Sequence, residues 1–197
     1  MPRPDRYSGF GLIELMVTIT LLSILMALAV PSMGAWIRNN KIRTVADSLQ
    51  NGLRQAQTEA LRRSRQVVFS LTNSTAPQTS LAAADDGRNW SINVVKLLTD
   101  ENDGVFVASG VLGAVGSDVQ IAGPAAVCFN SMGRLVANSN TQVSGSTSCD
   151  AASIPPTYDV TLPGADRPLR VLVALGGQVR ICDPNRSLSS GQPDGCP

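Results

Sequence analysis

The chain has 197 residues, which is enough for one ordinary domain with an appendage. It carries 16 basic and 15 acidic side chains, so no overall charge draws it to nucleic acid or to anionic lipid. It contains no histidine, which excludes imidazole general bases, Ser–His and Cys–His nucleophile pairs and histidine metal sites. We therefore expect a non-enzymatic protein that holds no metal and no cofactor.

The N-terminus combines a short polar leader, residues 1–9, with an apolar run that begins abruptly at Phe10. From Leu12 to Val30 the only ionisable residue is Glu14. A helix over this run would be about 28 Å long, close to the roughly 30 Å hydrocarbon core of a bilayer. No small-residue cleavage site follows it, because Val30-Pro31-Ser32 leads into more helical sequence. The sequence therefore predicts a membrane-spanning helix that is kept in the mature protein.

The run Gly9-Phe10-Gly11-Leu12-Ile13-Glu14 resembles the signature of type IV prepilins and pseudopilins. The resemblance implies that a prepilin peptidase and N-methyltransferase cuts after Gly9 and methylates the new N-terminal Phe10. It also implies that Glu14 pairs with the terminal amine of an adjacent subunit during filament assembly. Pro31 falls on a proline position of the family. Gly11 departs from the commoner threonine and should weaken the first helical turn slightly.

A second helical stretch follows Gly34, with apolar residues at steps of three and four. We expect the helix of residues 10–65 to pack by its first half into a filament, and by its second half onto its own β-sheet. Proline lacks one backbone donor, so a kink or local melting is predicted at Pro31. The predicted apolar face holds Ile42, Val45, Ala46, Leu49, Leu53, Ala56 and Ala60. The other face is basic and holds Arg38, Lys41, Arg43, Arg54, Arg62, Arg63 and Arg65. We interpret this face as solvated. The alternative is that it contacts acidic faces of neighbouring subunits or anionic lipid headgroups.

After Gln66 the pattern changes to short β-type runs separated by turn residues. The predicted fold class is α+β, a long N-terminal α-helix packed on a small antiparallel β-rich domain. The domains are a leader at 1–9, a transmembrane and filament-core helix at 10–65 and a globular domain at 66–197. The predicted strands are Val67–Leu71, Trp90–Val95, Val105–Val107, Val119–Ile121, Val127–Phe129, Tyr158–Leu162, Leu169–Leu175 and Gln178–Cys182.

The four cysteines all lie in the C-terminal half, and no two have the C-x-x-C spacing of a zinc or redox site. They predict two disulfides in an oxidising compartment. Together with the resemblance of the leader to prepilins, this implies that the globular domain lies in the periplasm. Three connectivities are open. We favour Cys128 with Cys149 and Cys182 with Cys196, because these pairs close the shortest loops. The polar segment 138–153 is expected to be a mobile loop held by Cys149.

The β-rich part resembles the GspH/FimT/FimU group of minor pseudopilins and minor pilins. The resemblance rests on Arg88-Asn89-Trp90, on the segment 128–135 and on the segment 176–182. It implies an inner-membrane protein that is assembled with other minor and major pilins into a type IV pilus, supporting assembly, twitching and adhesion. Before assembly its partner is membrane lipid. One alternative is a GspH-like subunit of type II secretion.

A second alternative is a FimT-like receptor for DNA uptake, because such proteins carry a Gly-Arg-x-Arg motif. Here the matching stretch is Gly177-Gln178-Val179-Arg180, which lacks one of the two cations. A local patch could still bind phosphates, and dispersed surface arginines are the simpler interpretation. The candidate DNA-binding residues are Arg167, Arg170, Arg180 and Arg186.

The acidic segment 100–104 could suggest calcium, but it lacks the later bidentate glutamate of an EF-hand loop. We interpret this segment as a polar hairpin turn.

Overall fold

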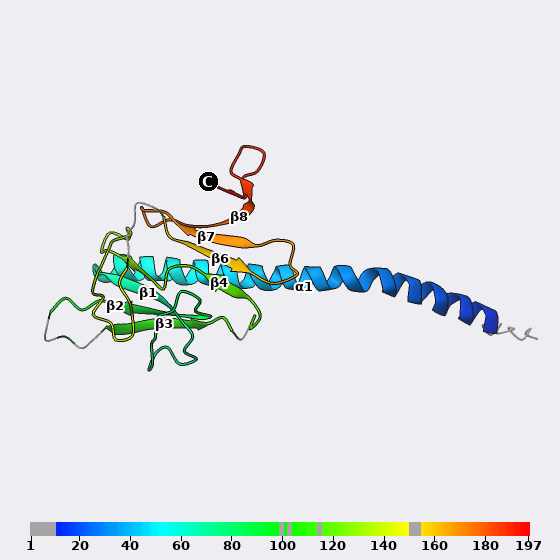
Figure 1. The fold of residues 1–197 in the computed structure, drawn as a ribbon, viewed down its shortest axis with the longest axis horizontal. Helices are drawn as coiled ribbons and strands as arrows, with labels where there is room; N and C mark the ends of the chain where they lie inside the picture. The colour runs from blue at the N-terminus through cyan, green and yellow to red at the C-terminus, as the bar shows by residue number, and fades with distance from the viewer. Residues whose placement is uncertain (1–10, 99–100, 102–103, 114–115, 150–154) are drawn as a thin grey trace, which may run out of the picture. The chain divides into compact units, whose positions relative to one another are not determined.

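The computed structural model describes residues 11–98, 101, 104–113, 116–149 and 155–197, with the side chains of residues 28–32 excepted (Figure 1). The chain forms two compact units, Met1–Ile37 and Arg38–Pro197. Each unit is described by itself below.

One helix, α1 (Leu12–Arg63), accounts for 52 residues and contributes to both units. Its backbone stays helical through Pro31, so the local melting predicted there is not observed. Proline removes only one backbone donor, and the helix continues on both sides of it. Among the residues whose side chains are described, no helical stretch is both long and apolar enough to cross a membrane. Residues 28–30 of the predicted span lie outside that set, and the span stays a prediction.

The helix ends two residues before the predicted position, at a C-cap built by Ser64 and Arg65. Ser64 adopts a φ of 51°, the left-handed conformation that usually falls to glycine at this point. Its N–H donates to Leu61 O at 3.2 Å, and the N–H of Arg65 donates to Ala60 O at 3.2 Å. These two bonds form a Schellman motif, which satisfies free carbonyls of the last turn and directs the chain into the first strand.

The first sheet has four antiparallel strands in the order β3-β2-β1-β5. Its strands are β1 (Val67–Thr72), β2 (Asn89–Val94), β3 (Val105–Val111) and β5 (Ala126–Phe129). β1 and β2 are buried along their whole length, because one face packs on the helix and the other is covered by loops of the same unit.

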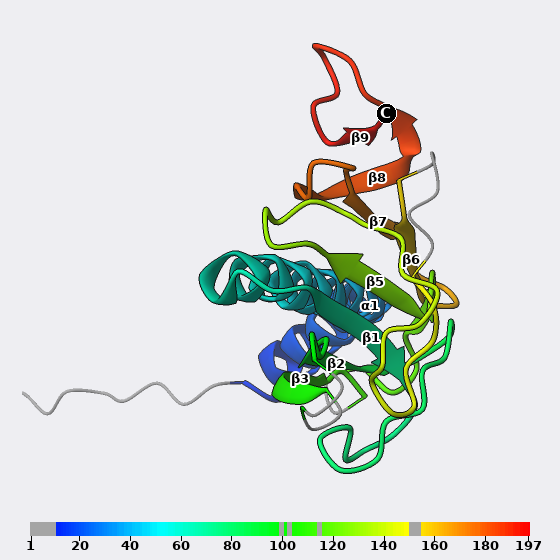
Figure 2. The ribbon, with the colours of Figure 1, turned by 90° about the vertical axis from the view of Figure 1, so that its left-hand side faces the viewer.

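The second sheet has five strands in the order β4-β6-β7-β8-β9. They are β4 (Gln120–Ala122), β6 (Thr157–Thr161), β7 (Leu169–Val173), β8 (Val179–Ser187) and β9 (Gly195–Cys196). All eight predicted strands are present, with shifted ends. β9 was not predicted, since a strand of two residues has no periodic sequence pattern. It pairs in parallel with β8, whereas an antiparallel sheet was expected. Figure 2 shows β8 and β9 above the second half of α1 and β2 and β3 below it.

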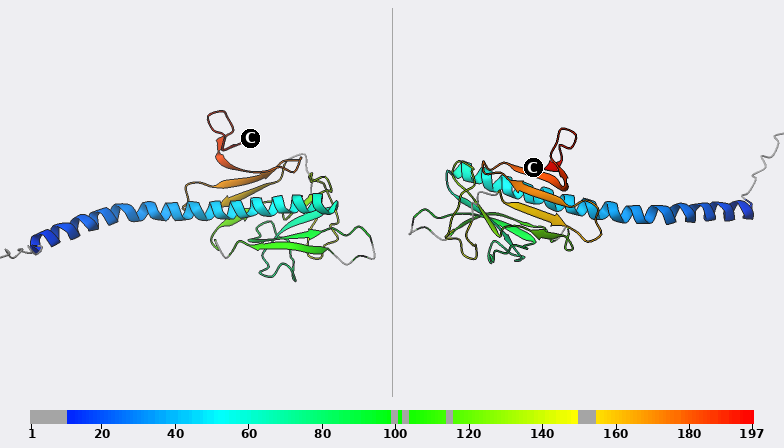
Figure 3. Two further views of the ribbon diagram at one scale, coloured as in Figure 1. Left: turned by 180° about the vertical axis from the view of Figure 1, so that it is seen from behind. Right: turned by 45° about the horizontal axis from the view of Figure 1, so that its top comes forward.

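The core of the unit Arg38–Pro197 forms where the second half of α1 lies between the two sheets (Figures 1 and 3). All seven residues of the predicted apolar face are at most 1% exposed, so that prediction is confirmed. Phe69 of β1 stacks on Trp90 with ring centroids 5.7 Å apart, and meets Tyr158 of β6 edge-on at 6.2 Å. These aromatic contacts connect the sheets through the same core.

Two disulfides join Cys128 to Cys149 and Cys182 to Cys196, which is the connectivity with the shortest loops. The first lies in a second apolar cluster, beside Val68, Ala126 and Val143. It therefore fixes the segment before residue 150 onto the outer face of the first sheet. The second closes the C-terminal loop between β8 and β9.

The basic face of the second helical half is only partly solvated, which corrects the sequence interpretation. Arg38 Nε donates to Gly164 O at 2.6 Å, and Lys41 Nζ lies 2.9 Å from Asp118. Arg65 meets Glu101 at 2.6 Å. Long cationic side chains reach around the helix to loops of both sheets, so this face also attaches the helix to the β-rich part.

Candidate assembly site

The predicted assembly residues begin beyond the described part of the chain, since Gly9 and Phe10 lie outside it. Glu14 is described: it lies in the first turn of α1 with its side chain exposed. The helix begins with Glu14 N–H and Leu15 N–H both donating to Gly11 O, at 3.0 and 3.2 Å. A carboxylate here is favoured by the helix dipole. Within the described residues, no side-chain partner is present for Glu14.

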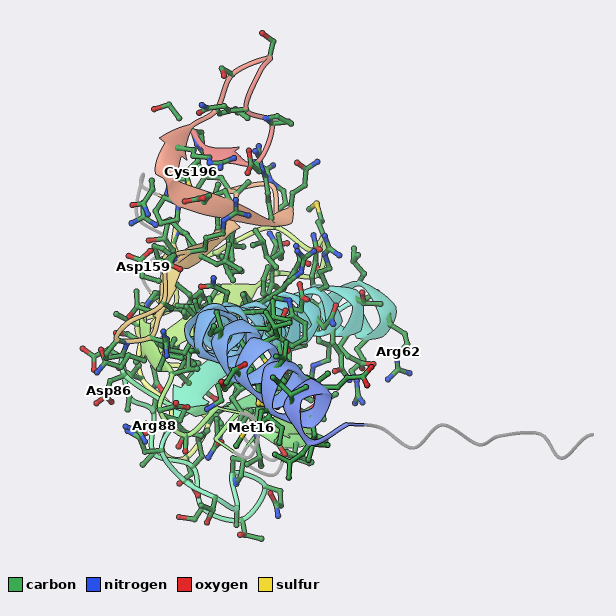
Figure 4. The ribbon with its side chains drawn as sticks, turned by 90° about the vertical axis from the view of Figure 1, so that its right-hand side faces the viewer. Met16, Arg62, Asp86, Arg88, Asp159 and Cys196 are labelled. Atoms are coloured by element: carbon green, nitrogen blue, oxygen red, sulfur yellow. A yellow bond between two sulfur atoms is a disulfide. The ribbon has the colours of Figure 1, made fainter. Side chains whose placement is uncertain are left out.

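The helix surface that follows is apolar and uncovered by its own chain. Its large apolar side chains between Leu12 and Met26 are 51–77% exposed. Met16, which is labelled in Figure 4, is one of them and is 61% exposed. An exposed apolar surface of this length marks contact with another protein or with lipid. Its large members are Leu12, Ile13, Leu15, Met16, Val17, Ile19, Leu21, Leu22, Ile24, Leu25 and Met26.

The hydroxyl groups on this segment do not interrupt its apolar character. Thr18 Oγ1 donates to Leu15 O at 2.8 Å, Thr20 Oγ1 to Val17 O at 2.8 Å and Ser23 Oγ to Thr20 O at 2.8 Å. Each hydroxyl donor is satisfied by the backbone of its own helix. The segment can therefore be buried by lipid or by other helices without leaving these donors unpaired.

The four arginines predicted as a DNA patch are mostly engaged inside the protein. Arg170 binds Asp159 through two hydrogen bonds, at 2.6 and 3.0 Å. Arg180 donates to two backbone carbonyls of the C-terminal loop, both at 2.9 Å. Arg186 lies 2.9 Å from Asp194. Only the guanidinium of Arg167 is without a hydrogen-bond partner or ion pair among the described residues. The DNA patch stays a prediction.

Two further arginines, Arg43 and Arg54, lie with Arg167 and Arg180 around one cleft. Sequence reasoning assigned them to the solvated helix face and did not connect them with the C-terminal arginines. The available signal was their spacing, since Arg43, Asp47, Gln50 and Arg54 form a stripe along one side of a helix. Contact with β8 depends on tertiary packing, which this stripe alone does not predict.

Two protein-family models match the chain, one over its N-terminal helix and one over its globular part. Residues 5–30 match the prokaryotic N-terminal methylation motif, and residues 45–177 match the family described as type II transport protein GspH. The chain belongs to the GspH family. It is thus a minor pilin or pseudopilin, a class of structural, non-catalytic subunits assembled into pili or pseudopili at the membrane. Its methylation motif implies processing by prepilin peptidase and assembly with other pilins.

Solved structures resemble the chain at low sequence identity. The type IV minor pilin FimU of Pseudomonas aeruginosa has a TM-score of 0.50 at 14% identity, covering 76% of this chain and 96% of FimU. A second crystal form of FimU gives 0.48 at 14% identity, over 72% and 96% of the two chains. The minor pseudopilin EpsH from the type 2 secretion system of Vibrio cholerae gives 0.45 at 13% identity, over 74% and 99%. No curated protein sequence matches.

Proposed function

We propose that this GspH-family subunit is a minor pilin of a type IV pilus. Prepilin peptidase cuts it after Gly9 and methylates Phe10. Before assembly the subunit lies in the inner membrane, with its globular domain in the periplasm. It then enters the pilus at low copy with other minor pilins, and supports pilus initiation, twitching and adhesion. The observation that carries the proposal is the match of residues 5–30 to the methylation motif, over a helix segment whose apolar side chains are exposed.

The apolar helix surface holds the subunit in the membrane before assembly. Burying such side chains is worth about 25 cal/mol per Å² of apolar area taken from water. In lipid that gain is already made, so packing and polar pairing decide how the helix associates with its neighbours. Glu14 supplies the polar pairing. A carboxylate costs about 2.5–3.5 kcal/mol at the bilayer centre and less at the end of the span, where Glu14 lies, and a neighbouring terminal amine at Phe10 would offset this cost. This pairing would set the register between adjacent subunits.

A second candidate is a minor pseudopilin of type II secretion, which the GspH match favours. Both systems use the same processing and the same helix packing. The disulfide between Cys182 and Cys196 resembles the C-terminal bracket of pilus minor pilins, and for that reason we place the pilus first. Deleting the gene distinguishes the two: loss of twitching with normal protein secretion supports the pilus, and the reverse result supports the secretion system.

The substitution Glu14→Gln tests the assembly role, because it keeps the side-chain shape and removes the charge. Membrane insertion should persist, since a neutral amide costs less in lipid than a carboxylate. Incorporation into sheared filaments should fall several-fold relative to the wild type. Asp85→Asn, at an exposed turn of the globular unit, is the matched acid-to-amide control and should incorporate normally. Normal incorporation of Glu14→Gln would contradict the proposed pairing with the amine.

A further inference from the structure

A cleft of about 530 Å³ lies in the unit Arg38–Pro197, between α1 and the strands β7 and β8. One wall is the helix stripe that starts at Arg43 and ends at Arg54. The opposite wall is formed by the start of β7, by β8 and by Asp194 of the C-terminal loop. Leu169, Val179 and Ile181 give the cleft an apolar portion.

The charges around the cleft favour an anionic ligand. Four arginines and three aspartates line it. Two of the aspartates, Asp183 and Asp194, share the single positive charge of Arg186, which lies outside the lining and 3.6 Å and 2.9 Å from them. The third, Asp47, lies 3.9 Å from Arg43, a long contact between two side chains that are both at least half exposed. The cationic side chains of the lining therefore outweigh the free carboxylates.

Two of the lining arginines are held in place by backbone carbonyls. Arg54 donates to Val179 O at 3.1 Å, and Arg180 donates to Pro193 O and Gly195 O at 2.9 Å. A carbonyl leaves the guanidinium charge uncompensated, and each guanidinium has five N–H donors, more than these contacts use. Arg167 has no side-chain partner within the described residues. The cleft thus combines two fixed cations, Arg54 and Arg180, with two cations whose donors are largely free for a ligand, Arg43 and Arg167.

We propose that this cleft binds an acidic segment of a neighbouring pilin subunit. Carboxylates of that segment meet Arg43 and Arg167, and an aliphatic side chain between them packs on Leu169 and Ile181. The inference rests on the proposed function, because it requires a neighbouring subunit in a filament. It assigns the globular unit its own contact with a neighbouring subunit, through carboxylates. This contact is separate from the packing of the N-terminal helix.

The cleft fits a peptide segment better than duplex DNA. Duplex DNA presents regularly spaced phosphates and is bound by basic surfaces that follow its backbone. Here Asp47, Asp183 and Asp194 lie among the arginines and would repel a run of phosphates. Arg170, which would have to extend the basic surface, is bound to Asp159 by two hydrogen bonds. Isolated carboxylates on a flexible chain can avoid the aspartates and still reach the arginines.

The test places a photo-crosslinking amino acid at Asp47 in the full-length protein, expressed in the cells that assemble it. Asp47 lines the cleft and its side chain is 51% exposed, so the probe leaves all four arginines in place. The same probe at Gln55, an exposed position of α1 outside the cleft lining, is the control. After irradiation, filaments are sheared and the crosslinked peptides are identified by mass spectrometry.

We expect a crosslink from position 47, absent from position 55, to a pilin segment that carries at least two carboxylates. Combining the probe with Arg43→Gln and Arg167→Gln should lower the yield about tenfold. Arg134→Gln removes an exposed arginine whose side chain has no partner within the described residues, and should leave the yield unchanged. Incorporation into filaments is measured in the same samples.

Several results would overturn the inference. Normal incorporation without a crosslink from position 47, or a crosslink to a segment without carboxylates, would remove the acidic partner and leave the proposed function intact. A crosslink to DNA would replace the partner by nucleic acid. Failure of the wild-type subunit to enter filaments would contradict the proposed function, and the inference with it.

Discussion

Gly52 of α1 lies directly against the indole of Trp90: a Cβ atom at position 52 would be 2.9 Å from Cε2 of Trp90 and 3.1 Å from Cε2 of Phe69. The indole also faces its cross-strand partner Gly110, where a Cβ would be 2.4 Å from the same ring atom. Two glycines therefore make room for the largest side chain of the core, which is 7% exposed. This packing sets how closely the helix approaches the first sheet.

Gly52→Val should destabilise the unit Arg38–Pro197 by about 1–3 kcal/mol, because the Cβ atom alone would lie 2.9 Å from the indole and the methyl groups need further room. Valine has the higher helix propensity, which offsets only a few tenths of a kcal/mol of this loss. Urea unfolding of a fragment that starts at Arg38 measures the change. Gln55→Val introduces the same side chain at an exposed position of the same helix, and should cost less than about 0.5 kcal/mol. Equal losses for the two variants would contradict the packing argument.

The ion pair between Arg65 and Glu101 predicts a pH dependence of stability. Hydrogen bonds from Arg65 and from the backbone N–H of Leu97 lower the pKa of Glu101 to about 2. The unfolded chain has a higher pKa for this carboxyl, so the pair stabilises the fold fully above about pH 4.5 and progressively less as pH falls toward 2.

An NMR titration of the Glu101 carboxyl measures this pKa directly. Arg65→Met should move the pKa back toward the ordinary glutamate value and should weaken the stability loss between pH 4.5 and 2. Arg134→Met removes an arginine elsewhere and should leave the pKa of Glu101 unchanged. An unchanged Glu101 pKa in Arg65→Met would show that the pair does not hold this carboxylate.

The two disulfides should differ in how readily they are reduced. Cys128 and Cys149 are 1% and 2% exposed, and apolar side chains cover their bond. Cys196 is partly exposed in the C-terminal loop. We therefore expect dithiothreitol to reduce the bond between Cys182 and Cys196 first, because a thiolate must reach a sulfur atom to attack it.

Replacing either pair by serines should cost about 2–4 kcal/mol by the loop-entropy model, in which loops of this length differ little. Timed alkylation followed by peptide mapping gives the order of reduction, and non-reducing mapping gives the connectivity. A crossed pair such as Cys128 with Cys182 would overturn the arrangement, and faster reduction of the buried bond would contradict the role of exposure.

The elements with a local periodic signal could be predicted from the sequence. The apolar residues from Ile42 to Ala60 recur at a strict helical spacing, and this spacing alone predicts that they are buried, as the structure shows. Strands such as β1 were visible as β-branched and aromatic runs. β9 was not, since Gly195 and Cys196 form a strand only because the C-terminal loop returns to β8.

The candidate sites show the same limit. The assembly motif is contiguous in sequence, so the position of Glu14 within it follows from the neighbouring residues alone. The arginine cleft joins α1 to β7 and β8, with more than a hundred residues between Arg54 and Val179. Such a site depends on which loops and strand edges meet, and no local pattern encodes that. Likewise, the partners of Arg170 and Arg180 appear only once the sheet register is known.

The most direct test of the proposed function is the intact mass of the subunit recovered from sheared filaments of cells with an active prepilin peptidase. We predict a species that starts at Phe10, has lost residues 1–9 and carries one added methyl group. Gly9→Val should block this processing and accumulate the precursor in the membrane, because a larger side chain hinders access to the scissile bond. A full-length, unmethylated chain in the filaments, or a processed chain that never enters them, would contradict the proposal.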